Sequence, residues 1–301
     1  MKFCIVNTPE LPAPGTFYMT VSKFASGFAR LGYQICEIKT NQELLSLPND
    51  AGTILMISNH GIEIDWDKKR LERLSHLTNA TKILWFFHSY LIKTNLDIPF
   101  DNWLLTGEHF HMPPTMEGHL SSYKFQETLE NYHPLTFMSY IDPEKVGTFI
   151  RGPIVWDAQF VGSPYKTEWL AKIPNCYAKT VALSTTEEDR INSFLCSHCA
   201  LGFHSDNNIR NNVVVERIPE ALSYGAICLS DNPTAVKFTD GVVELVQSLD
   251  EVKAKINFYK TNKEAAEKKR ISGYEWVKTK GTYKHLAQSF LNKMKELGYV
   301  Q

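Results

Sequence analysis

The chain has 301 residues, of which 43% are hydrophobic and 22% are charged, a composition that excludes an extended disordered chain. At ~150 residues per domain, this length favours two domains. The 32 Lys and Arg residues balance 33 Asp and Glu residues, so the formal net charge is -1 and gives no overall attraction to nucleic acid or to an anionic membrane.

Short apolar runs alternate with helix-patterned segments through the first half of the chain. A strand is expected at 2–6 and a helix at 16–32, where apolar residues recur every three or four positions until Gly32 ends the helix. Further strands are expected at 33–38, 53–58, 82–87, 102–106 and 135–140. Near-continuous apolar runs joined by helices are typical of a parallel sheet that is covered on both faces.

The same pattern starts again after 142–157, a stretch rich in Gly and Pro. Strands are expected at 158–162, 176–183, 198–203, 226–230 and 242–246. The sequence therefore predicts two doubly wound, Rossmann-like α/β domains facing a cleft, with domain ranges of 1–148 and 149–280. Within the remaining 281–301, a helix at 281–298 has one apolar face, so we expect it to pack back toward the first domain.

Several common sites and signals are missing from the sequence. No apolar run approaches the ~20 residues of a membrane span, so a cytoplasmic protein is expected. Neither the dinucleotide pattern G-x-G-x-x-G nor the phosphate loop G-x-x-x-x-G-K-[ST] occurs, which disfavours the usual nicotinamide and ATP chemistry. Cys196 and Cys199 have C-x-x-C spacing, but no second pair completes a zinc site, so all six cysteines are expected to be mostly buried thiols.

The turn after the first strand of the second domain is a candidate anion site. Gly162 and Ser163 follow that strand and precede a predicted helix, whose free N–H groups and dipole favour an anion. Lys166 would add a full positive charge. The alternative is an ordinary turn between a strand and a helix.

Arg217 and Glu220 form a second candidate, near the start of a helix at the carboxyl-end rim of the predicted sheet. Residues three apart share a helix face. A guanidinium fits phosphate oxygens, and a carboxylate can accept two hydrogen bonds from a ribose diol. The alternative is an i,i+3 salt bridge on a solvated face, which contributes only a few tenths of a kcal/mol.

The order of segments "AQFVGSPYK", "HCALGFHSDNN" and "VVERIPEALSYGAICLSD" resembles the nucleotide-sugar half of GT-B glycosyltransferases over about 155–298. The chain is most similar to the bacterial spore-coat type, and T-even phage glucosyltransferases share the Arg-x-x-Glu pair. The resemblance implies that Glu220 binds the ribose hydroxyls, that Arg217 contacts the diphosphate, and that the Gly162–Ser163 turn lies against the phosphates. The expected nucleotide-sugar-binding set is completed by Lys166, His204, Asn212 and Glu216.

One departure from the broader retaining family bears on the mechanism. That family has a second Glu eight residues before the first, where this chain has Asn212, so we expect an inverting reaction. No D-x-D motif stands in a strand-end loop of the second domain, so neither a metal nor another cofactor is expected. Inversion needs a general base in the first domain. Its candidates are His60, Asp65, His88 and Glu108, for each of which a capping or loop role is the alternative.

The expected donor is therefore a nucleoside-diphosphate sugar, and the acceptor is an unknown glycan, lipid-linked molecule or small molecule. A DNA acceptor is not expected because the chain is close to neutral. Two alternatives stay open at this point. One is a nucleotide-sugar 2-epimerase of the same fold, and the other is a module that binds a nucleotide or sugar without catalysis.

Overall fold

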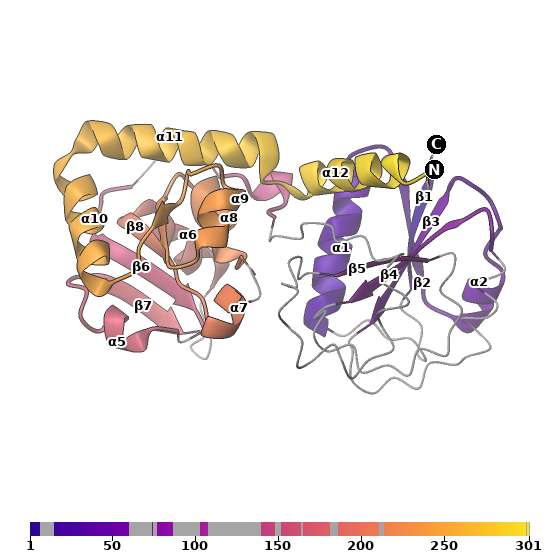
Figure 1. Ribbon diagram of the computed structural model, residues 1–301, viewed down its shortest axis with the longest axis horizontal. Helices are drawn as coiled ribbons and strands as arrows, with labels where there is room; N and C mark the ends of the chain where they lie inside the picture. Colours follow the sequence, from indigo (N-terminus) through magenta and orange to yellow (C-terminus); the bar gives the residue numbers. More distant parts are fainter. Residues whose placement is uncertain are drawn as a thin grey trace. The chain divides into compact units, whose positions relative to one another are not determined.

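The computed structural model describes residues 1–6, 15–59, 74, 77–86, 103–107, 140–147, 152–163, 165–180, 186–210, 214–298 and 300 (Figure 1). The chain divides into two compact units. Unit 1 consists of Met1–Phe137 and Tyr283–Gln301, and unit 2 consists of Met138–Thr282. This division, between Phe137 and Met138, comes earlier in the chain than the predicted domain boundary at 148/149.

Unit 1 contains a parallel sheet with the order β2-β1-β3-β4-β5. Its strands lie close to the expected ranges: β1 (Lys2–Val6), β2 (Gln34–Ile38), β3 (Thr53–Asn59), β4 (Thr81–Phe86) and β5 (Trp103–Gly107). Every pairing between these strands is parallel, as predicted. Helix α1 (Gly15–Ala29) follows β1, and α2 (Asn41–Leu45) begins with a capping box at Thr40. The strand expected at 135–140 lies almost wholly outside the described residues.

An aromatic cluster joins the sheet of unit 1 to two helices that lie side by side, α1 and α12 (Tyr283–Glu296). Phe28 of α1 stacks on Phe3 of β1 at 4.2 Å, and Phe24 meets Phe290 of α12 edge-on at 5.3 Å. The helices approach closely because Gly27 has no side chain, since a Cβ there would collide with the carbonyl oxygen of Tyr283. The apolar face of α12 is thus covered within unit 1.

Unit 2 has a second parallel sheet with the order β10-β9-β8-β6-β7. Its strands are β6 (Trp156–Gly162), β7 (Cys176–Thr180), β8 (Ser197–Gly202), β9 (Ile227–Ser230) and β10 (Glu244–Leu245). Strand β10 is shorter than the 242–246 run predicted for it. In both units the first strand lies between the second and the third, so the two sheets share one topology. This arrangement confirms the predicted fold class.

The helices of unit 2 differ strongly in length. They are η4 (Pro143–Lys145), α5 (Thr167–Leu170), α6 (Glu187–Leu195), α7 (Asp206–Arg210), α8 (Arg217–Ser223), α9 (Pro233–Phe238), α10 (Leu249–Thr261) and α11 (Lys263–Lys280). Helix α5 is a single turn, although the sequence predicted a longer helix after Ser163. Its N-cap, Lys166, has left-handed backbone angles (φ 51°) and makes no side-chain cap bond. So short a helix carries little dipole, and the anion site predicted from a helix N-terminus loses that support.

The core of unit 2 lies between the sheet and helices that include α10 and α11. Its fully buried members include Phe160 of β6, Leu201 of β8 and Leu229 of β9. All six cysteines are free thiols, of which three are buried and three are half-buried. Among the described residues, no helix has the length and apolar character needed to cross a membrane.

Candidate functional site

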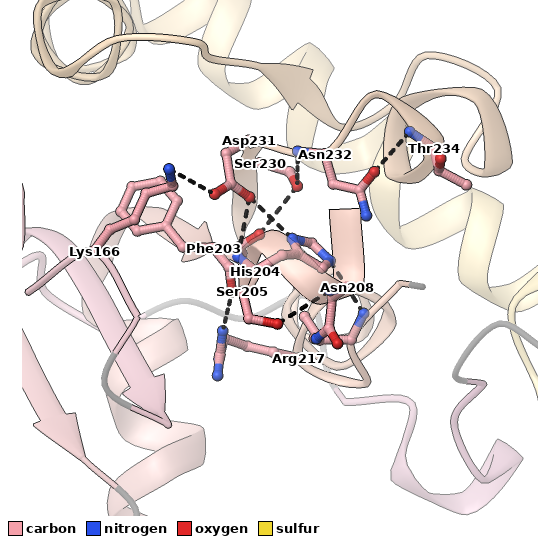
Figure 2. Close-up of polar contacts among 12 residues, drawn as sticks. Lys166, Phe203, His204, Ser205, Asn208, Arg217, Ser230, Asp231, Asn232 and Thr234 are labelled. Atoms are coloured by element: carbon pink, nitrogen blue, oxygen red, sulfur yellow. Dashed lines mark hydrogen bonds and ion pairs between the residues drawn. The ribbon is translucent and has the colours of Figure 1, made fainter. Parts of the chain in front are cut away.

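The site lies where the chain reverses its direction across the sheet of unit 2. Strand β6 pairs with β7 on one side and with β8 on the other. In doubly wound sheets, ligands bind at the carboxyl ends of strands next to such a reversal. The carboxyl ends of β6, β8 and β9 meet here. The residues at these ends are Gly162–Ser163, Phe203–His204 and Asp231–Asn232, respectively. Figure 2 shows the polar contacts among residues of the last two segments, Lys166 and Arg217.

Arg217, the first residue of α8, spans the ends of β6 and β8. Its Nε donates to the carbonyl of Val161, and its Nη1 donates to the carbonyl of Phe203 at 3.2 Å (Figure 2). The guanidinium also lies over the ring of Phe160, 4.4 Å from its centroid. Gly162 makes room for this group, because a Cβ at that position would collide with Nη2. The local sequence therefore fixes a cation at the reversal point.

The charge of Arg217 is partly removed from water. Burial lowers the pKa of Arg217 to about 10, against opposing effects from Cys228, Glu220 and other neighbours. The group is still protonated at neutral pH. Backbone carbonyls hold two of its three nitrogens, Nε and Nη1, and Nη2 makes no hydrogen bond within the described part of the chain.

His204, Asp231 and Lys166 form a polar chain across three strand ends. Asp231 Oδ1 accepts from the backbone N–H of His204 at 3.0 Å and lies 3.0 Å from His204 Nδ1. The backbone N–H of Val215 donates to His204 Nε2 at 3.2 Å, which places the imidazole proton on Nδ1. Asp231 Oδ2 has no hydrogen-bond partner among the residues that the structure describes, but it lies 3.6 Å from Lys166 Nζ. The cation predicted for the phosphates is therefore paired with a buried carboxylate.

Glu220 and Arg217 share α8 but have different partners. Glu220 Oε1 lies 2.9 Å from Nη2 of Arg190, a residue of α6. Among the ion pairs of the described residues, none joins Arg217 to Glu220, which is the i,i+3 salt bridge considered as the alternative. Arg217 instead contacts the strand ends. Arg217 therefore places a cation over the end of the sheet, and Arg190 of α6 separately holds the carboxylate of Glu220.

The remaining predicted residues have mixed outcomes. Ser163 is half-buried, and Glu216 is exposed at the N-cap of α8 without a side-chain cap bond. Asn212 and the candidate bases His60, Asp65, His88 and Glu108 lie outside the described residues. Their predicted roles stay predictions.

Sequence reasoning missed two side chains of this region. Asp231 follows a buried strand directly, which is the usual place for a ligand-binding side chain in this topology, so a signal existed. Arg190 gave no such signal, because its spacing from Glu220 follows no helical or strand period. Across the described ranges, no three His, Cys, Asp or Glu side chains gather into a possible metal site.

Comparison with known protein families supports the resemblance. Residues 149–292 match a family model described as "Glycosyl transferase-like". This range covers nearly all of unit 2 and most of α12. No curated protein sequence matches the chain.

Solved structures match both units. An α-glucosyltransferase in complex with UDP and a 13-mer DNA has a TM-score of 0.60 at 12% identity, covering 99% of each chain. The DNA-modifying enzyme β-glucosyltransferase has a TM-score of 0.57 at 10% identity, over 98% of this chain and 100% of that one. The β-glucosyltransferase of T4 phage in complex with UDP-glucose has a TM-score of 0.55 at 9% identity, over 97% and 99%.

At these identities the structural likeness shows the fold alone, and the family model matches the sequence of 149–292. The chain has the GT-B fold, and its second half is glycosyltransferase-like in sequence. Together, these findings confirm the predicted resemblance over that half of the chain.

Proposed function

We propose that the protein transfers a sugar from a UDP-sugar to an acceptor hydroxyl. One observation carries the proposal: Arg217 lies across the carboxyl ends of β6 and β8, beside a glycine that leaves space for its guanidinium. Doubly wound sheets bind ligands at this point. The solved T4 phage enzyme of the same fold is in complex with UDP-glucose, which favours UDP as the nucleotide.

In this proposal Arg217 binds the diphosphate. Its two carbonyl contacts fix the plane of the guanidinium before any ligand arrives, so little side-chain entropy is lost on binding. Burial weakens its hydration, which lowers the pKa to about 10 and strengthens its attraction to an anion. The Nη2 group beside the Gly162 turn would donate to a phosphate oxygen.

Glu220 would bind the ribose. Its carboxylate is mostly buried, with 13% of the side chain exposed, and one oxygen already accepts from Arg190. Two carboxylate oxygens have about four acceptor positions, so the 2′- and 3′-hydroxyl groups can still donate to them. The roles of Arg217 and Glu220 thus separate the charged end of the nucleotide from its sugar.

The reaction would proceed as a direct displacement with inversion. The bond between C1 of the sugar and the β-phosphate oxygen breaks, the acceptor oxygen bonds to C1, and the acceptor proton passes to a general base. Arg217 and Lys166 would stabilise the charge on the departing UDP without a metal. Asn212, in the place of a second Glu, supports inversion. The general base stays a prediction among His60, Asp65, His88 and Glu108.

Turnover with a panel of UDP-sugars tests the proposal. The protein is incubated with each donor, with and without pooled acceptors that include glycans, lipid-linked sugars and duplex DNA, and UDP release is measured. We expect UDP release that persists in EDTA and an acceptor-dependent product of inverted configuration. Conversion of the donor without UDP release would indicate epimerisation. Nucleotide binding without any turnover would indicate a binding module, and restoration by Mg²⁺ after EDTA would contradict the metal-free mechanism.

A further inference from the structure

We infer that Arg190 is a positioning residue that orients the Glu220 carboxylate for the ribose hydroxyls. The inference rests on the proposed function, since it assigns a partner to the residue that would bind the ribose. Arg190 belongs to α6 and Glu220 to α8, so their contact is tertiary and does not follow from the geometry of one helix. Arg190 Nη2 lies 2.9 Å from Glu220 Oε1.

A glutamate on a helix surface needs such a partner to act as a precise acceptor. Its side chain has three rotatable bonds, and fixing them costs conformational entropy. A ribose diol requires two acceptors in one orientation. If Arg190 fixes the carboxylate in the free protein, that entropy is lost during folding and does not weaken the binding of the nucleotide.

The guanidinium of Arg190 also faces a second carboxylate, that of Glu187. Its Nη2 lies 3.9 Å from Glu187 Oε1, and that oxygen also accepts from Lys145 Nζ at 2.7 Å. The chain of charges Lys145–Glu187–Arg190–Glu220 therefore runs from η4 through α6 to α8. Glu187 and Lys145 are about half exposed, whereas exposure falls to 35% at Arg190 and 13% at Glu220. The best shielded end of the chain is the proposed ribose acceptor.

One atom of Arg190 argues against a purely structural ion pair. Its Nε is buried and has no hydrogen-bond partner among the described residues. An unsatisfied buried donor is unfavourable, and a pair kept only for stability would be improved by exposing or satisfying it. The guanidinium instead keeps a geometry in which Nη2 reaches Glu220. This geometry is explained if the orientation of the carboxylate matters more than the satisfaction of Nε.

The test compares nucleotides that differ only in the ribose hydroxyls. Calorimetry measures the Kd of UDP and of 2′,3′-dideoxy-UDP for the full chain and for Arg190→Gln, Arg190→Lys and Lys145→Gln. In the parent protein, UDP should bind about tenfold more tightly than dideoxy-UDP, from hydrogen bonds to a charged group. Arg190→Gln should weaken UDP roughly fivefold and change dideoxy-UDP by less than about twofold, so that the difference nearly disappears. Arg190→Lys should restore part of it.

The control and the other outcomes separate the inference from the proposed function. Lys145→Gln removes the outer member of the chain, leaves Arg190 beside Glu220, and should keep the tenfold difference. If Arg190→Gln also keeps it, the inference is wrong while the ribose contact stands. If Arg190→Gln and Arg190→Lys weaken both nucleotides equally, Arg190 acts on the fold or the phosphates and the inference is again wrong. If the parent protein does not distinguish the two nucleotides, the proposed ribose contact itself fails.

Discussion

The two units have the same strand order but use the space after their first strand differently. In unit 1, β1 is followed by α1, a 15-residue helix that covers the sheet with Phe24 and Phe28. In unit 2, β6 is followed by the four-residue helix α5, and the guanidinium of Arg217 lies against the end of the strand. Topology alone therefore provides a crevice, and the side chains that enter it decide whether it binds a ligand.

Two glycines show the same contrast at the level of single atoms. Gly27 leaves space for a neighbouring helix, because its missing Cβ would meet the Tyr283 carbonyl. Gly162 leaves space for a charged side chain, because its missing Cβ would meet the Arg217 guanidinium. The first glycine serves packing, and the second serves the candidate site. Two predictions test this contrast between the units, and a third concerns the edge of the second sheet.

The largest effect is expected from Arg217→Ala. Removal of the cation should lower turnover by about 10²–10³-fold and weaken UDP binding, because it stabilises charge that develops on the leaving group. Arg217→Lys should rescue only partly, since an ammonium cannot reproduce the planar contacts to Val161 and Phe203. Glu220→Ala should mainly weaken binding, by ~1–3 kcal/mol. Alanine variants at both positions that bind UDP like the parent would refute the site.

A smaller effect is expected from Gly162→Ala. The new methyl group would displace the guanidinium at a position where φ is +154°, so UDP affinity should fall and the protein should be destabilised by about 1–3 kcal/mol. Gly27→Ala should destabilise the protein similarly and leave UDP affinity unchanged. Gly241→Ala, with φ +78° and open space around it, controls for backbone strain alone. Calorimetry and thermal melts measure both quantities, and equal UDP affinities for Gly162→Ala and Gly27→Ala would remove the contrast.

An effect on stability alone, without a change at the candidate site, is expected at the edge strand β10, which a polar cluster holds. Desolvation raises the pKa of Glu244, but hydrogen bonds from Lys255, Lys269 and Tyr259 outweigh it and lower the pKa to about 2. A lowered carboxyl pKa contributes stability above the unfolded value of 4.5, and this stability is lost as pH falls from 4.5 toward 2. Glu244→Gln should therefore reduce stability at pH 7 by roughly 1–3 kcal/mol and flatten the acid dependence. Glu275→Gln is the control, because Glu275 forms an exposed pair with Lys278. This change should alter the free energy of unfolding by less than ~0.5 kcal/mol at both neutral and acid pH.

Most of the fold could be predicted because buried parallel strands are apolar on both faces. Strands such as β3 and β9 were placed within one residue for this reason. Strand β10 was predicted too long because Val243 and Val246 are buried like strand residues although they lie just beyond its ends. Helix α5 was also predicted too long, because the apolar spacing of its segment does not reveal the left-handed backbone of Lys166.

The candidate site was less predictable than the fold. Arg217 and Glu220 stand out because their spacing marks one helix face, and Gly162 because it directly follows a strand. The pairing of Lys166 with Asp231, however, joins segments 65 positions apart, and that of Arg190 with Glu220 joins two helices. Tertiary packing alone creates such pairs. The sequence predicted Lys166 and Glu220 but not Asp231 and Arg190, the partners that hold them.

The division of unit 1 into two segments has a consequence for the order of events during translation. Phe290 packs against Phe24 and Phe28, yet all 145 residues of unit 2 are synthesised between them. On the ribosome, the later part of the chain can complete its own sheet and core while the earlier part still lacks one side of its aromatic cluster. Synthesis of unit 1 therefore begins first, but its folding is completed last. Until α12 has been made, the α1 surface is the part of the nascent chain that a chaperone would have to protect.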